Sequence, residues 1–364
     1  MSTIINANHY QVFIGNDTFI QLDKFLAKHY SGRKIFVLVD EHTRALCLPL
    51  ISERIPVLQS AVVLEIKSGE ENKSLETAQQ LWSQLTALDA GRRSLLINLG
   101  GGVVGDVGGF VASTFVRGIN FINIPTTLLA MVDASTGGKN GINFSGLKNQ
   151  VGTFTRPDAV FISPSFLKTL PENELRSGFA EVIKHALIAD KEKWEEIRQI
   201  ENFSDVNWVK LISHSVMIKN KIVNADFKDR TIRRTLNFGH TIGHALESYS
   251  LAHHVTPLKH GEAIAIGMIG ELFLSSKMKD FPVQEANEIT SFILKSFNYL
   301  SPEADTAEIV KLIHSDKKNE MSRLNFVLLE GIGRPVINQF PGEQMTAEAV
   351  EYAIHQFKAV VDHY

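Results

Sequence analysis

An apolar run that feeds directly into a glycine-rich turn constrains the fold of this chain more than any other feature. The run is Ser94-Leu-Leu-Ile-Asn-Leu99, and the turn after it places glycines at positions 100, 102 and 105. In this G-x-G-x-x-G spacing, missing side chains let backbone N–H groups approach a pyrophosphate at a helix N-terminus. Such turns also occur for packing alone. The pattern predicts a buried strand, a tight turn and a helix, and it favours a bound dinucleotide.

Two neighbouring segments strengthen the dinucleotide interpretation. Residues 119–124 form a second apolar strand at α/β spacing, and residues 133–141 are small, polar and glycine-rich around one lysine, Lys139. Such a run suits a second anion-binding cradle. No acidic residue ends the strand 119–124 to hold a ribose. We therefore expect that contact from Asp40, which ends the apolar run 34–39 at the carboxyl edge of the sheet.

Alternating strand and helix patterns over residues 1–164 predict an α/β domain wound on a mainly parallel sheet, and its glycine-rich turn favours a bound dinucleotide. Its expected strands are residues 34–39, 61–66, 94–99, 119–124 and 159–162, with an amphipathic helix at 75–88. After Pro164 helical periodicity dominates, and residues 165–364 are predicted to form a mainly helical, metal-binding domain. Its expected helices are residues 171–189, 205–224, 233–249, 261–277, 284–297, 304–315 and 346–360, with short strands at 324–329 and 335–338. A ligand cleft between two such domains is expected.

Composition limits the classes of function. A formal net charge of −3 over 364 residues gives no global attraction to nucleic acid, so any cationic site must be a local cluster. The single cysteine, Cys47, excludes an intramolecular disulfide and fits a reducing compartment. The sequence contains neither a signal peptide nor an apolar run long enough to span a bilayer. We therefore expect a cytoplasmic protein with no membrane or nucleic-acid partner.

Histidines in the second half of the chain form a candidate metal site. His240 and His244 are four residues apart, which places them on one face of a helix, and His260 opens a later helix. Glu181, on an otherwise apolar helix, is the candidate anionic ligand. A glutamate and two histidines with an open fourth position make a catalytic Zn²⁺ site that can polarise oxygen atoms. A lone histidine is more often a surface or core residue, but this cluster favours a metal.

Positive side chains gather in the same stretches: Arg117, Lys139, Lys148, Lys184, Lys219, Arg233, Lys317 and Lys318. Most lysines lie on solvated helix faces. Lys184 is one turn from Glu181 inside an apolar helix, and Lys139 lies among glycines, so these two favour a functional role. Several cations beside one metal suit a substrate that carries both a phosphate and a carboxylate.

These stretches together resemble the 3-dehydroquinate synthase family of sugar-phosphate cyclases, over residues 68–318 and in the family's order. The matching motifs include Gly69-Glu-Glu-Asn-Lys73, Gly100-Gly-Gly-Val-Val-Gly-Asp106, Pro125-Thr-Thr-Leu-Leu129, Lys148-Asn149, Phe166-Leu-Lys-Thr-Leu-Pro171, Ala180-Glu-Val-Ile-Lys184, Leu236-Asn-Phe-Gly-His-Thr-Ile-Gly-His244, His260-Gly-Glu262 and Asp316-Lys-Lys318. The sequence departs from the family at Asp229, where glutamate is usual. It also has a longer loop before His260, in which His253 and His254 are rival ligands.

The resemblance implies bound NAD, one divalent metal (zinc or cobalt), a homodimer and a reaction of the shikimate pathway. In that reaction 3-deoxy-D-arabino-heptulosonate 7-phosphate becomes 3-dehydroquinate and phosphate. The implied steps are transient oxidation of the C5 hydroxyl by NAD, β-elimination of phosphate, reduction at C5, ring opening and an intramolecular aldol. Redox is therefore transient, with no net change.

Carried over by position, the resemblance implies the metal ligands Glu181, His240 and His260, and it moves His244 to a contact with the ligands or with phosphate. The residues implied to hold NAD are Asp40, Ser68, Gly69, Glu70, Lys73, Gly101, Gly102, Val103, Val104, Gly105, Asp106, Thr126, Thr127, Lys139, Lys148, Phe166, Thr169, Leu170 and Glu174. The residues implied to bind the phosphorylated sugar acid are Asp133, Lys139, Asn149, Lys184, Lys219, Arg233, Asn237, His244 and Lys317, with Arg117 donated across the dimer interface.

Three alternatives stay open at this point. A neighbouring cyclase would act on a phosphosugar without a carboxylate, such as sedoheptulose 7-phosphate, although Arg233 and Asn237 together favour a carboxylated substrate. A metal-dependent polyol dehydrogenase would also combine NAD with a metal, but it would need no phosphate-binding lysines and would turn over free NAD. A non-catalytic NAD- and metal-binding sensor would show no turnover.

Overall fold

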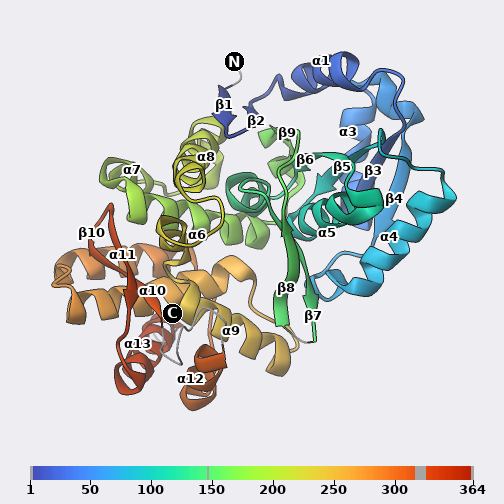
Figure 1. The fold of residues 1–364 in the computed structure, drawn as a ribbon. Coiled ribbons are helices and arrows are strands. Elements are labelled where there is room, and N and C mark those ends of the chain that lie inside the picture. The colour runs from blue at the N-terminus through green and yellow to red at the C-terminus, as the bar shows by residue number, and fades with distance from the viewer. Residues whose placement is uncertain (1–2, 146, 316–324, 362–364) are drawn as a thin grey trace. The chain divides into compact units, whose positions relative to one another are not determined.

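The computed structural model describes residues 3–145, 147–315 and 325–361 (Figure 1). The chain divides into two compact units, Met1–Leu175 with Asn207–Lys228, and Arg176–Val206 with Asp229–Tyr364. The first unit is α/β and the second is mainly helical, so the predicted fold class is confirmed. The functional boundary after residue 164 stays a prediction, and the compact units divide the chain differently from it because Asn207–Lys228 belongs with the first unit.

The sheet of the first unit has seven strands in the order β1-β2-β9-β6-β5-β3-β4. These are β1 (Thr3–Ala7), β2 (Tyr10–Ile14), β3 (Ile35–Asp40), β4 (Val62–Ile66), β5 (Leu95–Gly100), β6 (Asn120–Pro125) and β9 (Ala159–Ile162). All neighbours are parallel except the antiparallel pair β1 and β2. The winding direction reverses between β3 and β5. Ligands of open α/β sheets bind outside the carboxyl ends of the strands at such a reversal.

Helices of the first unit pack on this sheet. They are α1 (Thr18–Tyr30), α2 (Glu41–Leu46), α3 (Leu48–Ser52), α4 (Leu75–Ala87), α5 (Gly102–Thr114) and α8 (Trp208–Ala225). Apolar residues of α4 and α5, such as Leu81 and Val107, share one buried cluster with Leu38 of β3 and Leu96 of β5. The central strands are apolar on both faces, as expected of parallel strands buried on both sides.

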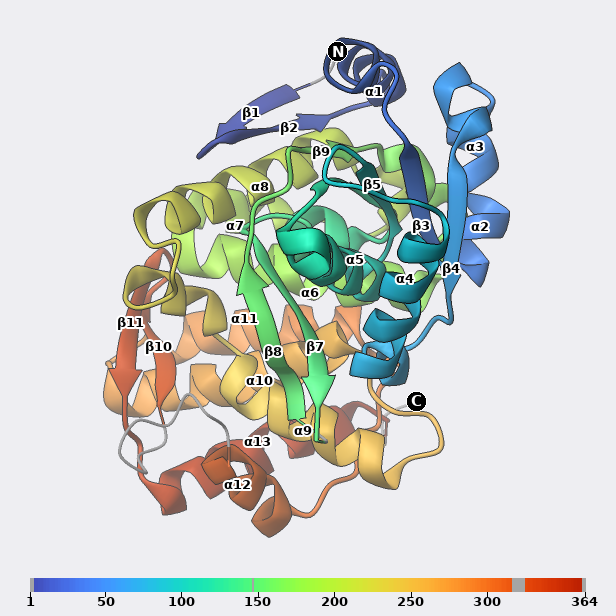
Figure 2. The same ribbon diagram turned by 45° about the vertical axis from the view of Figure 1, so that its right-hand side comes forward.

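A long hairpin beside helix α5 was not among the elements predicted from the sequence. It consists of β7 (Lys139–Phe144) and β8 (Leu147–Phe154), paired antiparallel (Figure 2). Gly141 and Gly152 permit close contact between its two strands. A Cβ added at Gly152, for example, would lie 2.4 Å from the carbonyl oxygen of Asn140. The hairpin packs on α5, where a Cβ added at Gly109 would lie 2.0 Å from Oδ1 of Asn140.

In the part of the chain that the structure describes, the second unit contains helices and a two-stranded sheet. Its elements are α6 (Glu172–Ala189), α7 (Lys191–Ile197), α9 (His240–His253), α10 (His260–Met278), α11 (Val283–Ser296), α12 (Thr306–Ser315), α13 (Glu343–Val361), β10 (Phe326–Gly331) and β11 (Arg334–Gln339). The prediction of one continuous helix over residues 233–249 is wrong. A 3₁₀ turn, Ile232–Asn237, precedes α9, and Gly239 between them has a φ of +78°, which ends one helix and starts the next.

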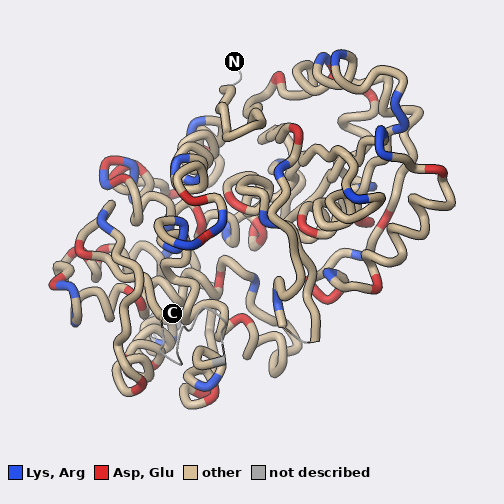
Figure 3. Tube along the Cα trace, in the orientation of Figure 1, with Lys and Arg blue, Asp and Glu red and all other residues tan. Residues whose placement is uncertain are grey.

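Charged residues are distributed over both units. Figure 3 shows basic and acidic residues interspersed along the Cα trace of each. This mixture agrees with the small net charge of the sequence. Among the described residues no helix is long and apolar enough to cross a membrane.

Candidate active site

The glycine-rich turn joins strand β5 to helix α5 in the first unit. Gly101 is the N-cap of α5. Because glycine has no side chain, it offers no side-chain acceptor to the first N–H groups of the helix. Those N–H groups and the helix dipole favour an anion. A small cavity lies against the turn, lined by Asn98, Gly100, Gly101, Gly102, Gly105, Asn123, Pro125, Ala130, Ala134 and Ser135. The turn therefore suits the pyrophosphate of a dinucleotide.

Asp40 lies at the carboxyl end of β3, beside the reversal in the sheet. Its Oδ1 accepts a 2.7 Å hydrogen bond from the backbone N–H of Thr43 and a 2.8 Å bond from the Thr43 hydroxyl. Asp40 is thus the N-cap of helix α2. These bonds hold the carboxylate at the sheet edge, where the ribose contact is predicted.

The loop after β4 is tied to α5 and to the hairpin by Lys73. Its Nζ lies 2.6 Å from Oδ2 of Asp106 and 2.5 Å from Oδ1 of Asn149. Burial raises the pKa of the Asp106 carboxyl, and the charge of Lys73 acts in the opposite direction. The structure therefore brings two predicted NAD residues together with one predicted substrate residue, Asn149.

Asn143 completes this network, and sequence reasoning missed it. Its backbone N–H donates to the carbonyl of Lys73 over 2.8 Å, and its side-chain amide donates to Oε1 of Glu70 over 3.0 Å. Its Oδ1 accepts from the backbone N–H of Asn149 over 2.9 Å. The amide-rich stretch around residue 143 could have indicated a polar network, but only the folded hairpin shows which residues Asn143 contacts.

Lys219 and Asp133 form a second polar pair of the first unit. The Nζ of Lys219 on α8 donates to Oδ1 of Asp133 over 2.7 Å and to its backbone carbonyl over 2.6 Å. Asp133 belongs to a π-helical turn, Ala130–Ala134. Both were predicted to bind substrate, and the structure places them in contact although they are 86 positions apart in sequence.

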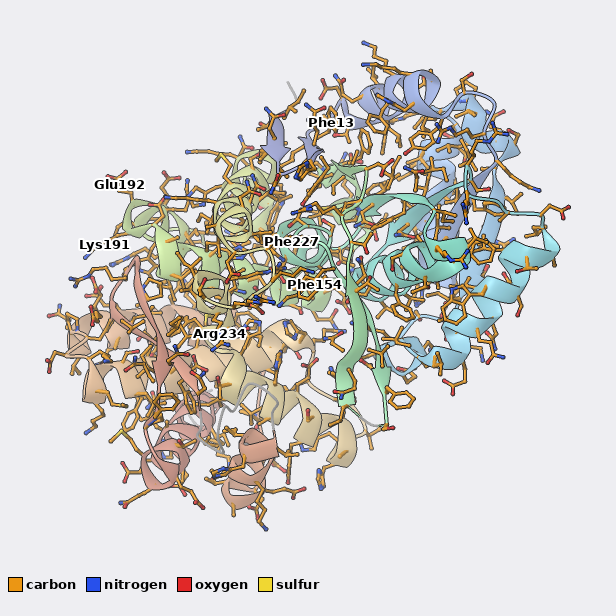
Figure 4. The ribbon with its side chains drawn as sticks, in the orientation of Figure 1. Phe13, Phe154, Lys191, Glu192, Phe227 and Arg234 are labelled. Carbon is orange, nitrogen blue, oxygen red and sulfur yellow. The ribbon has the colours of Figure 1, made fainter. Side chains whose placement is uncertain are left out.

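Aromatic packing supports the turn that carries Lys139. Gly138 has a φ of +67°, and a Cβ added there would lie 3.1 Å from the ring of Phe227. Phe154 and Phe227 lie next to each other (Figure 4), with ring centroids 5.7 Å apart, and the Arg156 guanidinium lies 3.7 Å from the Phe227 centroid. The Lys139 side chain itself is exposed at the start of β7.

The other predicted NAD and substrate residues of the first unit lie near these elements. Ser68 and Gly69 are in the turn after β4, where the Ser68 hydroxyl donates to Oε1 of Glu41 over 2.7 Å. Lys148 is on β8, and Arg117, with a φ of +68°, is exposed. The first turns of α5 contain Gly102, Val103, Val104, Gly105 and Asp106. Strand β6 is followed by Thr126 and Thr127. The 3₁₀ turn Pro164–Thr169 contains Phe166 and Thr169, Leu170 comes directly after it, and Glu174 lies on α6.

Four predicted metal-site residues converge in the second unit. Oε1 of Glu181, fully buried on α6, lies 3.6 Å from Nε2 of His240 and 3.7 Å from Nε2 of His260. Ring nitrogens of His240, His244 and His260 lie within 4.8 Å of one another. A buried carboxylate facing imidazole nitrogens is a donor set that zinc and similar divalent metals prefer. The residues therefore fit the predicted metal, and the geometry brings His244 into the same cluster.

Backbone and carboxylate partners orient the histidine rings. Nδ1 of His240 lies 3.1 Å from the carbonyl oxygen of Phe238, which can only accept, so Nδ1 donates and Nε2 faces Glu181. Nδ1 of His260 lies 3.3 Å from Oε2 of Glu247. Burial lowers the pKa of His260, but the charges and hydrogen bonds of Glu247 and Glu181 outweigh it and raise the pKa to about 9. Such partners fix the ring orientation of metal-binding histidines.

Glu247 was not predicted as a functional residue, although a signal was present. It follows His244 by three residues on α9 and therefore shares a helical face with the histidines. Lys184, one turn after Glu181 on α6, makes an ion pair with that carboxylate. Arg233 is buried in the 3₁₀ turn Ile232–Asn237, which Asn237 ends.

The rival histidines have other partners. Nδ1 of His253 lies 2.9 Å from the carbonyl oxygen of Tyr249, and the two rings stack with centroids 4.2 Å apart. Nδ1 of His254 lies 3.0 Å from the Ser250 hydroxyl. Lys317, and Lys318 beside it, lie outside the described residues.

Solved structures with this fold include two synthases that were determined with NAD⁺ and a divalent metal. A 2-deoxy-scyllo-inosose synthase complexed with carbaglucose-6-phosphate, NAD⁺ and Co²⁺ superposes with a TM-score of 0.83 and 24% identity, over 96% of this chain and 99% of that chain. The 2-epi-5-epi-valiolone synthase of Streptomyces hygroscopicus subsp. jinggangensis 5008, with NAD⁺ and Zn²⁺ bound, gives 0.82 and 24%, over 97% and 99%. The chain therefore shares the fold of these two synthases.

Sequence comparison narrows this class to one family. The family models described as 3-dehydroquinate synthase N-terminal and C-terminal match residues 63–177 and 178–319. The 3-dehydroquinate synthase of Parabacteroides distasonis is 42% identical over 352 residues, covering 95% of this chain and 98% of that protein. That of Latilactobacillus sakei subsp. sakei is 38% identical, covering 96% and 97%. The chain belongs to the 3-dehydroquinate synthase family.

Proposed function

We propose that this chain converts 3-deoxy-D-arabino-heptulosonate 7-phosphate into 3-dehydroquinate and phosphate, as a 3-dehydroquinate synthase. The observation that carries the proposal is the 42% identity to such an enzyme along almost the whole chain, together with family models that match residues 63–319 without a gap. The chain is accordingly a carbon–oxygen lyase that eliminates phosphate. It acts in the shikimate pathway, which leads to chorismate and the aromatic amino acids.

The cofactors are NAD⁺ and one divalent metal, Zn²⁺ or Co²⁺. When bound, NAD⁺ supplies a reversible hydride acceptor and the metal supplies a Lewis acid that polarises substrate hydroxyls. We propose that the first turns of α5, with Asp40, Glu70 and Lys73, hold the dinucleotide. We propose Glu181, His240 and His260 as the metal ligands, because their donor atoms face one another.

The chain's own side chains supply positioning and electrostatic stabilisation. We propose that the planar Arg233 guanidinium and Asn237 bind the substrate carboxylate, and that lysines and His244 bind the phosphate. The ion pair with Glu181 holds the Lys184 ammonium beside the histidines. The leaving phosphate can take up the proton lost from C6, so elimination needs no further base from the chain. The full proposed substrate set is Arg117, Asp133, Lys139, Asn149, Lys184, Lys219, Arg233, Asn237, His244 and Lys317.

We further propose a cytoplasmic homodimer. The substrate is a phosphorylated sugar-like molecule, and the finer assignment as a sugar acid rests on Arg233 and Asn237. A dimer is supported by Arg117, whose side chain is exposed and whose positive φ turns the backbone at this position. The cytoplasm is supported by the single cysteine, Cys47, which is buried and has no second cysteine with which to form an intramolecular disulfide.

Phosphate release from 3-deoxy-D-arabino-heptulosonate 7-phosphate tests the proposed reaction. We expect release by purified protein with NAD⁺, loss after chelation, and restoration by Zn²⁺ or Co²⁺. Release from sedoheptulose 7-phosphate alone would assign the chain to a neighbouring cyclase. A steady rise in absorbance at 340 nm with a polyol, without phosphate release, would instead assign it to the dehydrogenases of this fold.

A further inference from the structure

The N-terminus of helix α9 is capped by a side chain from another helix. Gly239, its N-cap, has no side chain, so the first N–H groups of the helix need an acceptor from elsewhere. Glu271 on α10 supplies it. Its Oε2 accepts from the N–H of Gly239 over 2.7 Å, and its Oε1 accepts from the N–H of Thr241 over 3.1 Å. These two N–H groups flank His240, the first residue of α9.

Close packing of α9 on α10 makes this reach possible. A Cβ added at Gly267 would lie 2.0 Å from the carbonyl oxygen of Gly239, and one added at Gly243 would lie 3.0 Å from the carbonyl oxygen of Ala263. The two helices therefore touch through their backbones. Glu271 is one turn after Gly267 on the same face of α10, which directs its side chain at the start of α9.

Burial makes the contact strong and specific. Glu271 has no solvent exposure, so its carboxylate depends on protein donors. Backbone N–H groups and the positive end of a helix dipole stabilise a carboxylate. Because one oxygen binds on each side of His240, rotation or fraying of that turn would break both hydrogen bonds. The carboxylate thus holds the backbone from which the His240 ring projects.

We propose that Glu271 is a positioning residue for the metal ligand His240. It acts through the backbone, whereas Glu247 contacts the ring of His260 directly. The inference rests on the proposed metal site, since it assigns a role in metal binding to a residue that is itself no ligand. We therefore expect loss of the Glu271 carboxylate to lower the metal affinity more strongly than it lowers the overall stability of the fold.

Co²⁺ titration of the metal-free protein, followed by visible d–d absorption, tests the proposal. Partners of metal ligands typically change metal affinity by about 10–100-fold, and we expect Glu271→Ala to raise the Kd for Co²⁺ within this range. Glu271→Gln, which keeps one acceptor, should give a smaller rise. Ile289→Val on α11, a buried change away from α9, is the control for general destabilisation and should leave the Kd within twofold of wild type.

The outcomes separate the inference from the proposed function. If wild-type protein gives no d–d spectrum, the metal site itself is wrong. If wild type binds Co²⁺ and both Glu271 variants bind it within twofold of wild type, Glu271 only stabilises the fold and the inference fails. Should Glu271→Ala fail to fold, Glu271→Gln decides the question, because its side chain has the same shape.

Discussion

The ammonium nitrogen of Lys73 lies 2.6 Å from Oδ2 of Asp106 and thereby links the loop after β4 to helix α5. Lys73 is buried, and the same nitrogen contacts Asn149 on β8. One cation therefore contacts both the glycine-rich helix and the hairpin, two elements that are separate in sequence. The arrangement makes Lys73 central to the shape of the predicted NAD site.

Lys73→Met should weaken NAD⁺ binding at least tenfold. The change leaves a mostly buried Asp106 carboxylate without its counterion, which costs about 1–3 kcal/mol. NAD⁺ titration by calorimetry and thermal unfolding without ligand measure the two effects. In the double variant with Asp106→Asn the losses should be less than additive, because the partners interact directly. Strict additivity would count against the pair as a functional unit.

Gly105→Ala and Gly108→Ala should have opposite effects on stability. A Cβ at Gly105 would meet no atom within 4 Å, whereas one at Gly108 would lie 2.0 Å from Oδ1 of Asn98 and 2.9 Å from Leu38. Because alanine favours a helix, Gly105→Ala should stabilise the ligand-free protein by about 0.5–1 kcal/mol. Gly108→Ala should destabilise it by about 1–3 kcal/mol. Thermal unfolding measures both.

The same Gly105→Ala variant tests the role of the turn. Gly105 belongs to the predicted NAD set, so the added methyl should weaken NAD⁺ binding in a protein that is more stable than wild type. A more stable protein with unchanged NAD⁺ affinity would mean that the pyrophosphate does not approach this helix turn.

Glu181→Gln should abolish phosphate release and weaken metal binding while leaving NAD⁺ affinity unchanged. The amide removes the negative charge that faces His240 and His260. Metal analysis after dialysis and a separate NAD⁺ titration provide the two measurements. Loss of NAD⁺ affinity in a variant that still retains its metal would contradict the assignment of the two cofactors to different units.

Arg117→Ala should be inactive alone but active when mixed with Glu181→Gln, if Arg117 completes the partner subunit's site. After random reassortment, half of the dimers are mixed and each has one complete site, so activity should reach about one quarter of wild type. Phosphate release after mixing under dissociating conditions is the measurement. A mixture of Glu181→Gln with Lys184→Met is the matched control and should stay inactive. An inactive Arg117 mixture would place that arginine in its own subunit's site or outside any site.

The parallel strands could be predicted because their sequence carries the information locally. The strands over residues 94–99 and 159–162 are mainly apolar runs, and the structure has β5 at Leu95–Gly100 and β9 at Ala159–Ile162. The hairpin could not be predicted in this way. Strand β8 is largely exposed, and β7 packs on α5 through the contact of Gly109 with Asn140, which only the folded chain creates.

Spacing predicted part of the metal cluster and missed what supports it. Four-residue spacing places His240 next to His244, and their ring centroids are 5.1 Å apart. Glu271 gave no such signal, because it meets α9 only through helix packing. The helix break at Gly239 was also missed. The apolar periodicity of the sequence continues across Gly239, and the positive φ of this residue leaves no trace in that periodicity.

Contact between the backbones of α9 and α10 has a consequence for how this enzyme can change. Main-chain atoms limit the spacing of the helices that carry His240 and His260 most closely at Gly267, where an added Cβ would lie 2.0 Å from the carbonyl oxygen of Gly239. Laboratory evolution could therefore replace many neighbours of the histidines to admit a new substrate while their separation is preserved. At Gly267 even one added carbon would push the helices apart, so adaptation at this position would be blocked.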